Sequence, residues 1–197
     1  MMIDPWIESV EFHSSHHDFK KIPQSKTMPQ VAFCGRSNAG KSSLINAILS
    51  KKDLVHTSST PGKTRSLNFF LLNKRIFLVD LPGFGYAKAS HSVRDNMISA
   101  VNGYLNDTDT LRMLFILCDS KRPLPEEELG LVDTCIVKKI QPIIIRTKID
   151  KLNQKERDLV KKETIDLVNM IPEVTVVLAS IKNQSGIQNL RDLLKTL

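Results

Sequence analysis

The residues from Gly35 to Ser42 carry the strongest chemical signal, a Gly-x-x-x-x-Gly-Lys-Ser loop between an apolar segment and a segment of helical period. Glycines at both ends let the backbone close around phosphates, so that its N–H groups and the following helix amino terminus face the anion. Lys41 would reach the β and γ phosphates, and the Ser42 hydroxyl would bind Mg²⁺. The candidate phosphate ligands are Gly35, Arg36, Ser37, Asn38, Ala39, Gly40, Lys41 and Ser42.

A second candidate motif, Asp80-Leu81-Pro82-Gly83, follows a short apolar segment at the position where a GTPase carries Asp-x-x-Gly. Asp80 would hold Mg²⁺ through a water molecule, and the Gly83 N–H would contact the γ phosphate. Taken alone, this pattern fits an ordinary turn equally well.

A third candidate motif, Thr147-Lys148-Ile149-Asp150, follows the apolar segment that begins at Ile143. The Asp150 carboxylate can accept hydrogen bonds from N1–H and the 2-amino group of guanine, which adenine does not offer. The Lys148 stem can pack over the base. The three motifs together favour guanine over adenine.

Strand-like and helical segments alternate along the chain, which is typical of a mostly parallel sheet whose connections are helices. The expected strands are Val31–Cys34, Leu67–Leu72, Arg75–Val79, Met113–Asp119, Ile143–Thr147 and Val174–Ala179. The expected helices are Lys41–Leu49, Val93–Leu105, Glu126–Lys138, Gln154–Met170 and a carboxyl-terminal stripe of Ile187, Leu190, Leu194 and Leu197. We therefore predict a three-layer α/β fold with a six-stranded sheet, helices on both faces, and the ligand at the carboxyl ends of the strands.

Residues 1–30 contain Pro5, Pro23 and Pro29 and show no sustained period, so they are predicted to form an arm of the same domain. One short strand is expected around Val10 to Phe12. Residues 31–197 are predicted to be the nucleotide-binding domain.

Several segments are more specific than any general nucleotide-binding pattern, and by them the chain resembles the bacterial EngB family (also called YihA or YsxC) within the TrmE-Era-EngA-EngB-Septin-like class of P-loop GTPases. The segments are Gly35–Asn46, Ser59–Thr64, Leu67–Phe70, Asp80–Ala87 and Thr147–Leu152. The resemblance spans roughly residues 7 to 195. It implies a P-loop GTPase fold, with GTP or GDP and Mg²⁺ as cofactors.

The resemblance also implies roles for residues outside the three motifs. Thr64 would be the switch residue that joins Ser42 and Asp80 on Mg²⁺, and the nucleotide would be flanked by Gly62, Lys63, Thr64, Arg65 and Ser66. A loop that supports guanine would consist of Leu178, Ala179 and Ser180. Ala179 stands where the family has Ser, so we expect weaker support for this loop while the Ser180 N–H still contacts guanine.

The expected hydrolytic machinery is incomplete. Phe84 follows Gly83 where Ras-type enzymes place the Gln that orients water, so intrinsic hydrolysis is expected to be slow. By likeness to related GTPases, Asn38 is expected to help bind a K⁺ ion against the phosphates. Neither Arg36 nor Arg65 is identified as an arginine finger. The expected catalytic set is Asn38, Lys41, Thr64 and Gly83, and Lys52–Arg65 and Phe84–Ser92 are expected to be mobile switch loops.

The charge balance favours an anionic partner, since 28 Lys and Arg residues against 21 Asp and Glu residues give a net charge of +7. The segment Lys138 to Lys162 holds nine basic and three acidic residues, a net charge of +6. A solvated helix face would explain this segment equally well. The resemblance implies maturation of the large ribosomal subunit and a link to cell division and septation, and rRNA phosphates would suit the basic segment.

Three classes of function stay open from the sequence. The first is a monomeric, GTP-switched factor that acts on the large ribosomal subunit or its precursor. The second is an rRNA-binding assembly protein in which the nucleotide is mainly structural. The third is a P-loop ATPase or kinase, which Asp150 disfavours.

The sequence points to the cytoplasm. The longest apolar run, Met113 to Cys118, is too short to span a bilayer, and Asp4 and Glu8 do not fit a signal peptide. The three cysteines are too few and scattered for a disulfide framework, so reduced thiols are expected. His13, His16 and His17 match no motif; a solvated, mobile trio is expected in preference to a metal site.

Overall fold

The computed structural model describes residues 4–16, 27–51, 54–55, 66–83 and 101–197. Seven strands form one sheet in the order β1-β3-β4-β2-β5-β6-β7. Strands β2, β4, β5, β6 and β7 run parallel, and β3 runs antiparallel to both of its neighbours. The bounds are β1 Val10–His16, β2 Gln30–Gly35, β3 Leu67–Leu72, β4 Ile76–Asp80, β5 Leu111–Asp119, β6 Gln141–Thr147 and β7 Thr175–Leu178. The six predicted strands are present, and the arm adds the seventh, which is longer than predicted.

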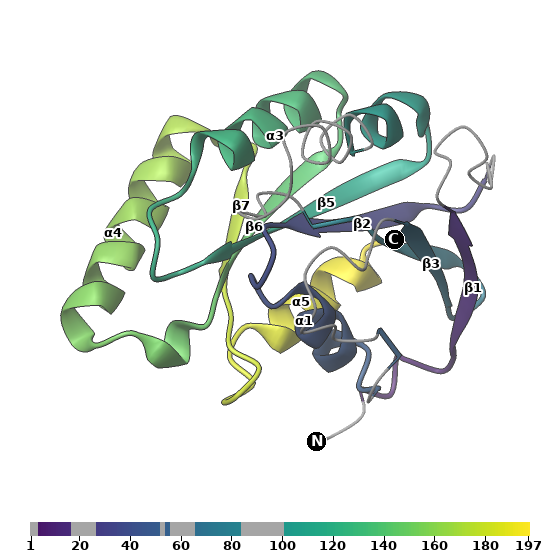
Figure 1. Ribbon diagram of the computed structural model, residues 1–197, viewed down its shortest axis with the longest axis horizontal. Helices are drawn as coiled ribbons and strands as arrows, with labels where there is room; N and C mark the ends of the chain where they lie inside the picture. The colour runs from purple at the N-terminus through teal and green to yellow at the C-terminus, as the bar shows by residue number, and fades with distance from the viewer. Residues whose placement is uncertain (1–3, 17–26, 52–53, 56–65, 84–100) are drawn as a thin grey trace.

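Helices cover both faces of the sheet, with α1 and α5 on one face and α3 and α4 on the other (Figure 1). The bounds are α1 Lys41–Ile48, α3 Glu126–Val137, α4 Gln154–Met170 and α5 Ile187–Lys195, with a 3₁₀ turn η2 at Ile149–Lys151. Residues 101–107 are also helical. The predicted helix Val93–Leu105 is therefore seen only from residue 101 onward, because its first part lies outside the described residues.

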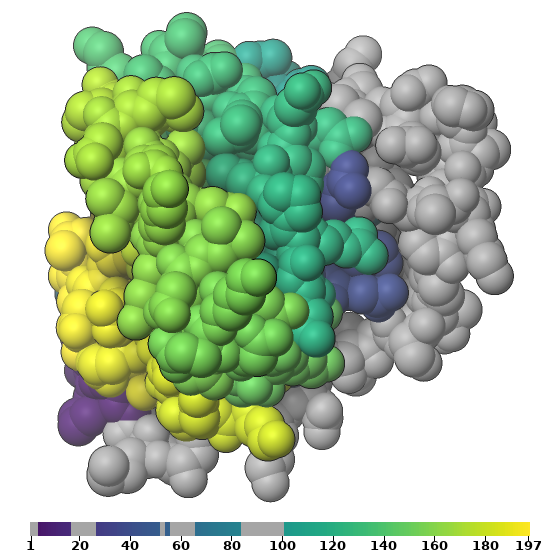
Figure 2. Space-filling model, turned by 90° about the vertical axis from the view of Figure 1, so that its left-hand side faces the viewer, coloured from purple at the N-terminus to yellow at the C-terminus, as the bar shows by residue number. Residues whose placement is uncertain are grey.

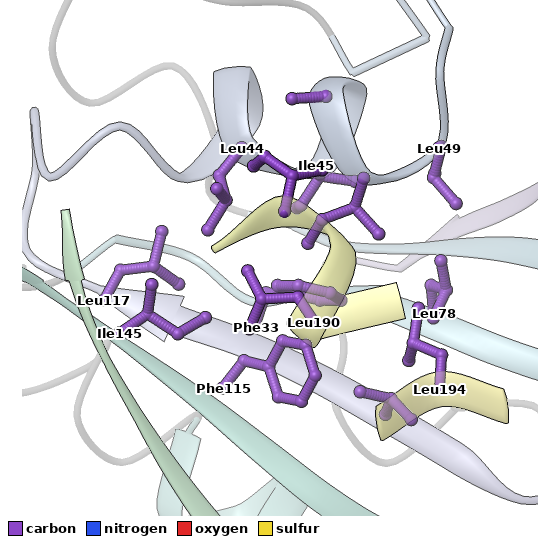
Figure 3. Packing of buried hydrophobic residues seen from close by; sticks show 14 of the residues in the cluster. Phe33, Leu44, Ile45, Leu49, Leu78, Phe115, Leu117, Ile145, Leu190 and Leu194 are labelled. Carbon is purple, nitrogen blue, oxygen red and sulfur yellow. The ribbon is translucent and has the colours of Figure 1, made fainter. Parts of the chain in front are cut away.

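The core follows from the alternation of side chains along the strands. In β2, Val31 and Phe33 join the layer under α1 and α5, whereas Ala32 and Cys34 join the opposite layer. All four are fully buried, which is typical of a parallel strand covered on both faces. Figure 3 shows sheet residues packed against the two helices of one layer: Phe33, Phe115, Leu117 and Ile145 from the sheet, Leu44 and Ile45 from α1, and Leu190 and Leu194 from α5.

The arm is attached to the rest of the chain at two places. The Asn73 side chain in the β3–β4 turn accepts hydrogen bonds from the N–H groups of Glu8 and Ser9 at 2.9 and 3.1 Å, and donates to the Trp6 carbonyl at 2.7 Å. At the other place, Asp4 contacts two side chains of α5. These contacts hold β1 against β3.

The structure bears on two further predictions, one about the cysteine thiols and one about membrane-spanning helices. The cysteines Cys34, Cys118 and Cys135 are free and buried, as predicted, and burial raises the pKa of Cys118 and Cys135 to about 12. Among the described residues, no helix has the length and apolar character needed to cross a bilayer.

Candidate nucleotide-binding site

The phosphate loop joins the end of β2 to the start of α1, and its backbone requires both glycines. A Cβ atom on Gly35 would lie 2.7 Å from the Leu117 carbonyl oxygen of β5, so only glycine allows this approach of the two strands. Gly40 has φ 92°, in the left-handed region that glycine adopts at little cost. The predicted loop is therefore formed by a backbone that other residues would not tolerate at these two positions.

The amino terminus of α1 is left without a side-chain cap. Its N-cap residue is Gly40, no side chain of the described residues caps it, and no acidic residue lies in its first turn. The first N–H groups of a helix have no partner within the helix, and its dipole favours negative charge there. This terminus is suited to an anion such as a phosphate.

The Asp80–Gly83 motif lies against the phosphate loop. Asp80 ends β4 with only 2% of its surface exposed, and its carboxylate forms an ion pair with Lys41. A Cβ atom on Gly83 would lie 3.4 Å from the Gly35 carbonyl oxygen and 3.6 Å from the Ser37 nitrogen. Leu81 between them is fully buried in the core. The structure thus brings this motif and the loop together.

Two side chains of the third motif bind backbone carbonyls of the phosphate loop. The Thr147 hydroxyl lies 2.8 Å from the Ala39 carbonyl oxygen, to which it donates. The Lys148 ammonium donates to the Asn38 carbonyl at 2.6 Å and to the Asp119 carboxylate at 2.9 Å. The end of β6 is therefore coupled to the loop, and Asp119 enters the site although sequence reasoning did not select it. Its position at the end of a parallel strand was the available signal.

The Asp150 carboxylate is positioned by the loop after β7. The Ser180 hydroxyl donates to it at 2.5 Å, and this hydrogen bond lowers the pKa of Asp150. In this chain, a residue of the predicted Leu178–Ser180 loop therefore holds the Asp150 carboxylate directly. The Ser180 N–H donates to the Ser185 carbonyl at 3.0 Å, so in this conformation the N–H predicted to contact guanine is used within the loop.

A cleft of about 160 Å³ separates the phosphate loop from the end of β5 and the start of α3. Its charged lining comes from both sides of the gap, with Arg36 and Lys148 facing Asp119 and Glu128. Arg122 also lines the cleft. Sequence reasoning selected Arg36 and Lys148 and missed Arg122, Asp119 and Glu128.

Several predicted site residues lie outside the described residues: Gly62, Lys63, Thr64, Arg65 and Phe84, together with most of the predicted switch segment Lys52–Arg65 and all of Phe84–Ser92. Ser66 is described and buried, and its hydroxyl donates to the Asn68 side chain at 3.3 Å.

The basic segment Lys138 to Lys162 is not one continuous surface. Arg146 is only 3% exposed and donates to the Arg122 carbonyl at 3.0 Å, and Lys148 is engaged by the phosphate loop. The prediction that all nine basic residues could face a partner is therefore wrong for these two, because β6 buries Arg146 and Lys148, directly after β6, is held by the phosphate loop and Asp119. Seven remain exposed: Lys138, Lys139, Lys151, Lys155, Arg157, Lys161 and Lys162.

Two of the unassigned histidines are packed on the sheet. The His13 ring contacts Phe77 with 5.1 Å between centroids, and the His16 ring contacts Phe69 at 5.7 Å. Both rings hydrogen-bond the Ser14 hydroxyl. Both histidines belong to β1, so the prediction that they are mobile is wrong, but His13 is exposed, as predicted, and His16 is half-buried. His17 lies outside the described residues. Among the residues that the structure describes, no group of three or more His, Cys, Asp or Glu side chains could hold a metal ion.

A model of the family described as 50S ribosome-binding GTPases matches residues 30–170, which include all three motifs. The probable GTP-binding protein EngB of Leptospira biflexa is 46% identical over 173 residues, which is 87% of this chain and 81% of that protein. This chain belongs to the EngB family of GTP-binding proteins. It is a P-loop GTPase, an enzyme that hydrolyses GTP. The EngB protein of Desulfovibrio desulfuricans is 43% identical over 162 residues, 82% of this chain and 79% of that protein.

Solved structures agree with the family. The crystal structure of a probable EngB protein superposes with a TM-score of 0.68 at 21% identity, covering 85% of this chain and 97% of that one. Aquifex aeolicus Era bound to GDP and aluminium fluoride has a TM-score of 0.61 at 25% identity, covering 86% of this chain and 56% of that one. The predicted fold class, a three-layer P-loop GTPase fold, is confirmed.

Proposed function

We propose that this EngB-family GTPase is a molecular switch in assembly of the large ribosomal subunit, with GTP hydrolysis to GDP resetting its affinity for the particle. The observation that carries the proposal is that Lys148 donates to the Asn38 carbonyl of the phosphate loop, while two residues further along the chain the Asp150 carboxylate is held by the Ser180 hydroxyl. A base reader and a phosphate cradle are thereby held in one unit. Residues 31–197 would form the GTP-binding domain and residues 1–30 its arm.

The proposed nucleotide contacts divide by chemistry. The loop Gly35–Ser42 and Gly83 face the phosphates, whereas Lys148, Asp150 and the Leu178–Ser180 loop face the base. The Ser180 hydroxyl stabilises the ionised Asp150 carboxylate, which only accepts hydrogen bonds. Guanine offers two donors to this carboxylate, N1–H and the 2-amino group, and adenine does not.

Mg²⁺ fits the residues present. Ser42 and Asp80 offer the hard oxygen donors that Mg²⁺ prefers, and Thr64 would add a third in the GTP state. Mg²⁺ would neutralise charge on the β and γ phosphates. Lys41, which pairs with Asp80 in this structure, would turn to the phosphates. An Era structure with 25% identity and a TM-score of 0.60 contains MgGDPNP and a segment of 16S ribosomal RNA.

Hydrolysis would depend on Asn38 and a potassium ion. Asn38 is exposed on the phosphate loop and has φ 67°, and its amide oxygen is of the chemical kind that binds K⁺. Phe84 cannot orient the attacking water, so the intrinsic rate would be slow.

The ribosomal contact would use exposed basic residues near the amino-terminal half of α4. Lys151, Lys155, Lys161 and Lys162 are exposed on η2 and α4, and Figure 2 shows α4 lying open across one face. Such lysines bind rRNA phosphates without reading sequence.

The proposed setting is the cytoplasm, and the protein is proposed to be a monomer. Its proposed link to cell division and septation would follow from its role in ribosome assembly.

The test is binding to purified large subunits with GDPNP, with GDP and without nucleotide. The proposal expects the GDPNP state to bind at least about tenfold more tightly than the GDP state. Lys161→Gln should weaken this binding and reduce its salt dependence, whereas Lys74→Gln in the β3–β4 turn should not. Equal binding in every nucleotide state would support the structural-nucleotide alternative, and equal uptake of GDP and ADP would support an ATPase.

A further inference from the structure

The first turn of α3 carries three consecutive glutamates that differ sharply in environment. Glu126 and Glu127 are exposed, but Glu128 has only 1% of its side chain exposed and faces the phosphate loop. The residue opposite is Arg36, the second residue of that loop. Its guanidinium donates from Nη2 to Glu127, and its Nε lies 3.6 Å from Oε1 of Glu128.

Buried Glu128 and half-buried Arg36 are not arranged for greatest stability. A buried carboxylate is costly to keep charged, and burial raises the pKa of Glu128, while the charge of Arg36 opposes that rise. Oε2 of Glu128 and Nε of Arg36 are both buried without a hydrogen-bond partner among the described residues. A hydrophobic residue would be a cheaper occupant of this position.

The pair also lies at the nucleotide site. Arg36 and Glu128 line the cleft of about 160 Å³ together with Asn38 and Lys148. The turn of the phosphate loop begins at Arg36, whose carbonyl accepts the Ala39 N–H at 3.0 Å. A contact that fixes the Arg36 side chain therefore also helps to fix the turn whose backbone N–H groups would face the phosphates.

We propose that Glu128 is a positioning residue for nucleotide binding, which acts through Arg36 to hold the phosphate loop in its binding conformation. This inference rests on the proposed assignment of Gly35–Ser42 as the phosphate site. The ion pair draws the Arg36 guanidinium toward α3 and orders the loop before the nucleotide arrives. Less ordering then remains to be done on binding, which raises affinity.

The test is a double-mutant cycle read out as the dissociation constant and dissociation rate of a fluorescent GDP. The variants are Glu128→Gln, Arg36→Gln and their combination, with Glu126→Gln as the matched control in the same helical turn. We expect Glu128→Gln to raise the dissociation constant about tenfold and Glu126→Gln to leave it within about twofold. The combined variant should be no weaker than Arg36→Gln alone, because Arg36→Gln already removes the contact that Glu128→Gln removes.

Arg36→Lys provides a second measurement that does not depend on Glu128→Gln being folded. Lysine keeps the charge and should retain part of the affinity that Arg36→Gln loses, a rescue that a purely steric role would not give. The inference is overturned if folded Glu128→Gln binds GDP as tightly as the unmodified protein, or if the two effects add. Both outcomes concern the variants and leave GDP binding by the unmodified protein intact. If the unmodified protein itself failed to bind GDP, the proposed function would be contradicted instead.

Discussion

Asp119 at the end of β5 and Lys148 after β6 form an ion pair of 2.9 Å, and the same ammonium donates at 2.6 Å to the Asn38 carbonyl of the phosphate loop. Burial alone would raise the pKa of Asp119, but the hydrogen bonds from Lys148 and the Lys121 N–H, with nearby positive charge, lower it overall. Asp119 is therefore charged at neutral pH and fixes Lys148 beside the phosphate loop.

Replacing Asp119 should consequently weaken nucleotide binding. In Asp119→Asn the Lys148 ammonium loses its charged partner, and the stem that would pack over guanine is less constrained. We expect a dissociation constant for GDP raised about five- to tenfold, corresponding to roughly 1 kcal/mol for a partly exposed charged contact. Isothermal titration calorimetry measures it, with Asp109→Asn as an exposed control. Unchanged affinity in Asp119→Asn would show that Lys148 is positioned without Asp119.

Base selection should depend on Asp150 and on the hydroxyl that supports it. Asp150→Asn exchanges an acceptor for a donor, so GDP affinity should fall about 100-fold while the xanthine nucleotide gains affinity. Ser180→Ala should lower GDP affinity about fivefold, the value of one hydrogen bond. Competition titrations with GDP, XDP and ADP measure both effects, and Ser185→Ala is the control. If Asp150→Asn still prefers GDP to XDP, Asp150 does not read the base.

Potassium dependence should depend on Asn38. The unmodified protein should hydrolyse GTP faster in K⁺ than in Na⁺, and Asn38→Ala should remove the difference. Because Asn38 adopts φ 67°, alanine adds backbone strain, so Asn38→Gly serves as a second variant that fits the left-handed region. Single-turnover rates in the two salts decide the question, and equal rates for the unmodified protein would end the proposal.

The sequence patterns predicted the strands and helices well, because the residues that form each pattern lie within a few positions of one another in the chain. The bounds of β3 and α4 match the prediction at both ends, and α4 begins at a capping box in which Asn153 and Glu156 each bind the other's backbone N–H. The three motifs likewise reached one edge of the sheet, since parallel strands place their carboxyl ends together.

Contacts between side chains of different elements could not be predicted in the same way. Arg146 looked like a surface cation, yet it is buried and 3.4 Å from Glu163 of α4. Arg36 and Glu128 meet only because α3 packs beside the loop. The hydrogen bond from the Ser180 hydroxyl to Asp150 was not predicted at all, since Ser180 was expected to act through its backbone N–H. Such pairings depend on which helix faces meet, and the hydrophobic period of a single chain does not determine that.

The carboxyl end of α1 should depend on Arg191 of α5. This buried guanidinium donates to the carbonyls of Ile48 and Ala47 at 2.8 and 3.0 Å and to the Ser50 hydroxyl at 2.6 Å. Its charge also complements the helix dipole. Arg191→Met should remove three hydrogen bonds to a charged donor and lower the free energy of unfolding by about 3 kcal/mol. Urea unfolding measures the loss, and the exposed Lys182→Met should change it by under about 0.5 kcal/mol.

Acid stability should carry a contribution from Asp4. Hydrogen bonds from Gln188 and the Trp6 N–H, together with Lys195 at 3.0 Å, lower the pKa of Asp4 from 3.8 to about 2. A carboxyl group with a depressed folded pKa stabilises the protein above its unfolded pKa, and this contribution is lost as the pH falls from about 4 to about 2.

Asp4→Asn should therefore lower the free energy of unfolding by about 1 kcal/mol at pH 7 and make little difference near pH 2. Urea unfolding of both proteins across this range measures the two curves. Asp192→Asn tests whether the effect belongs to Asp4, since Asp192 shares Gln188 and Lys195 but lies on the exposed side of α5. A constant difference between Asp4→Asn and the unmodified protein at every pH would mean that lost packing, and not the carboxylate charge, is responsible for the change.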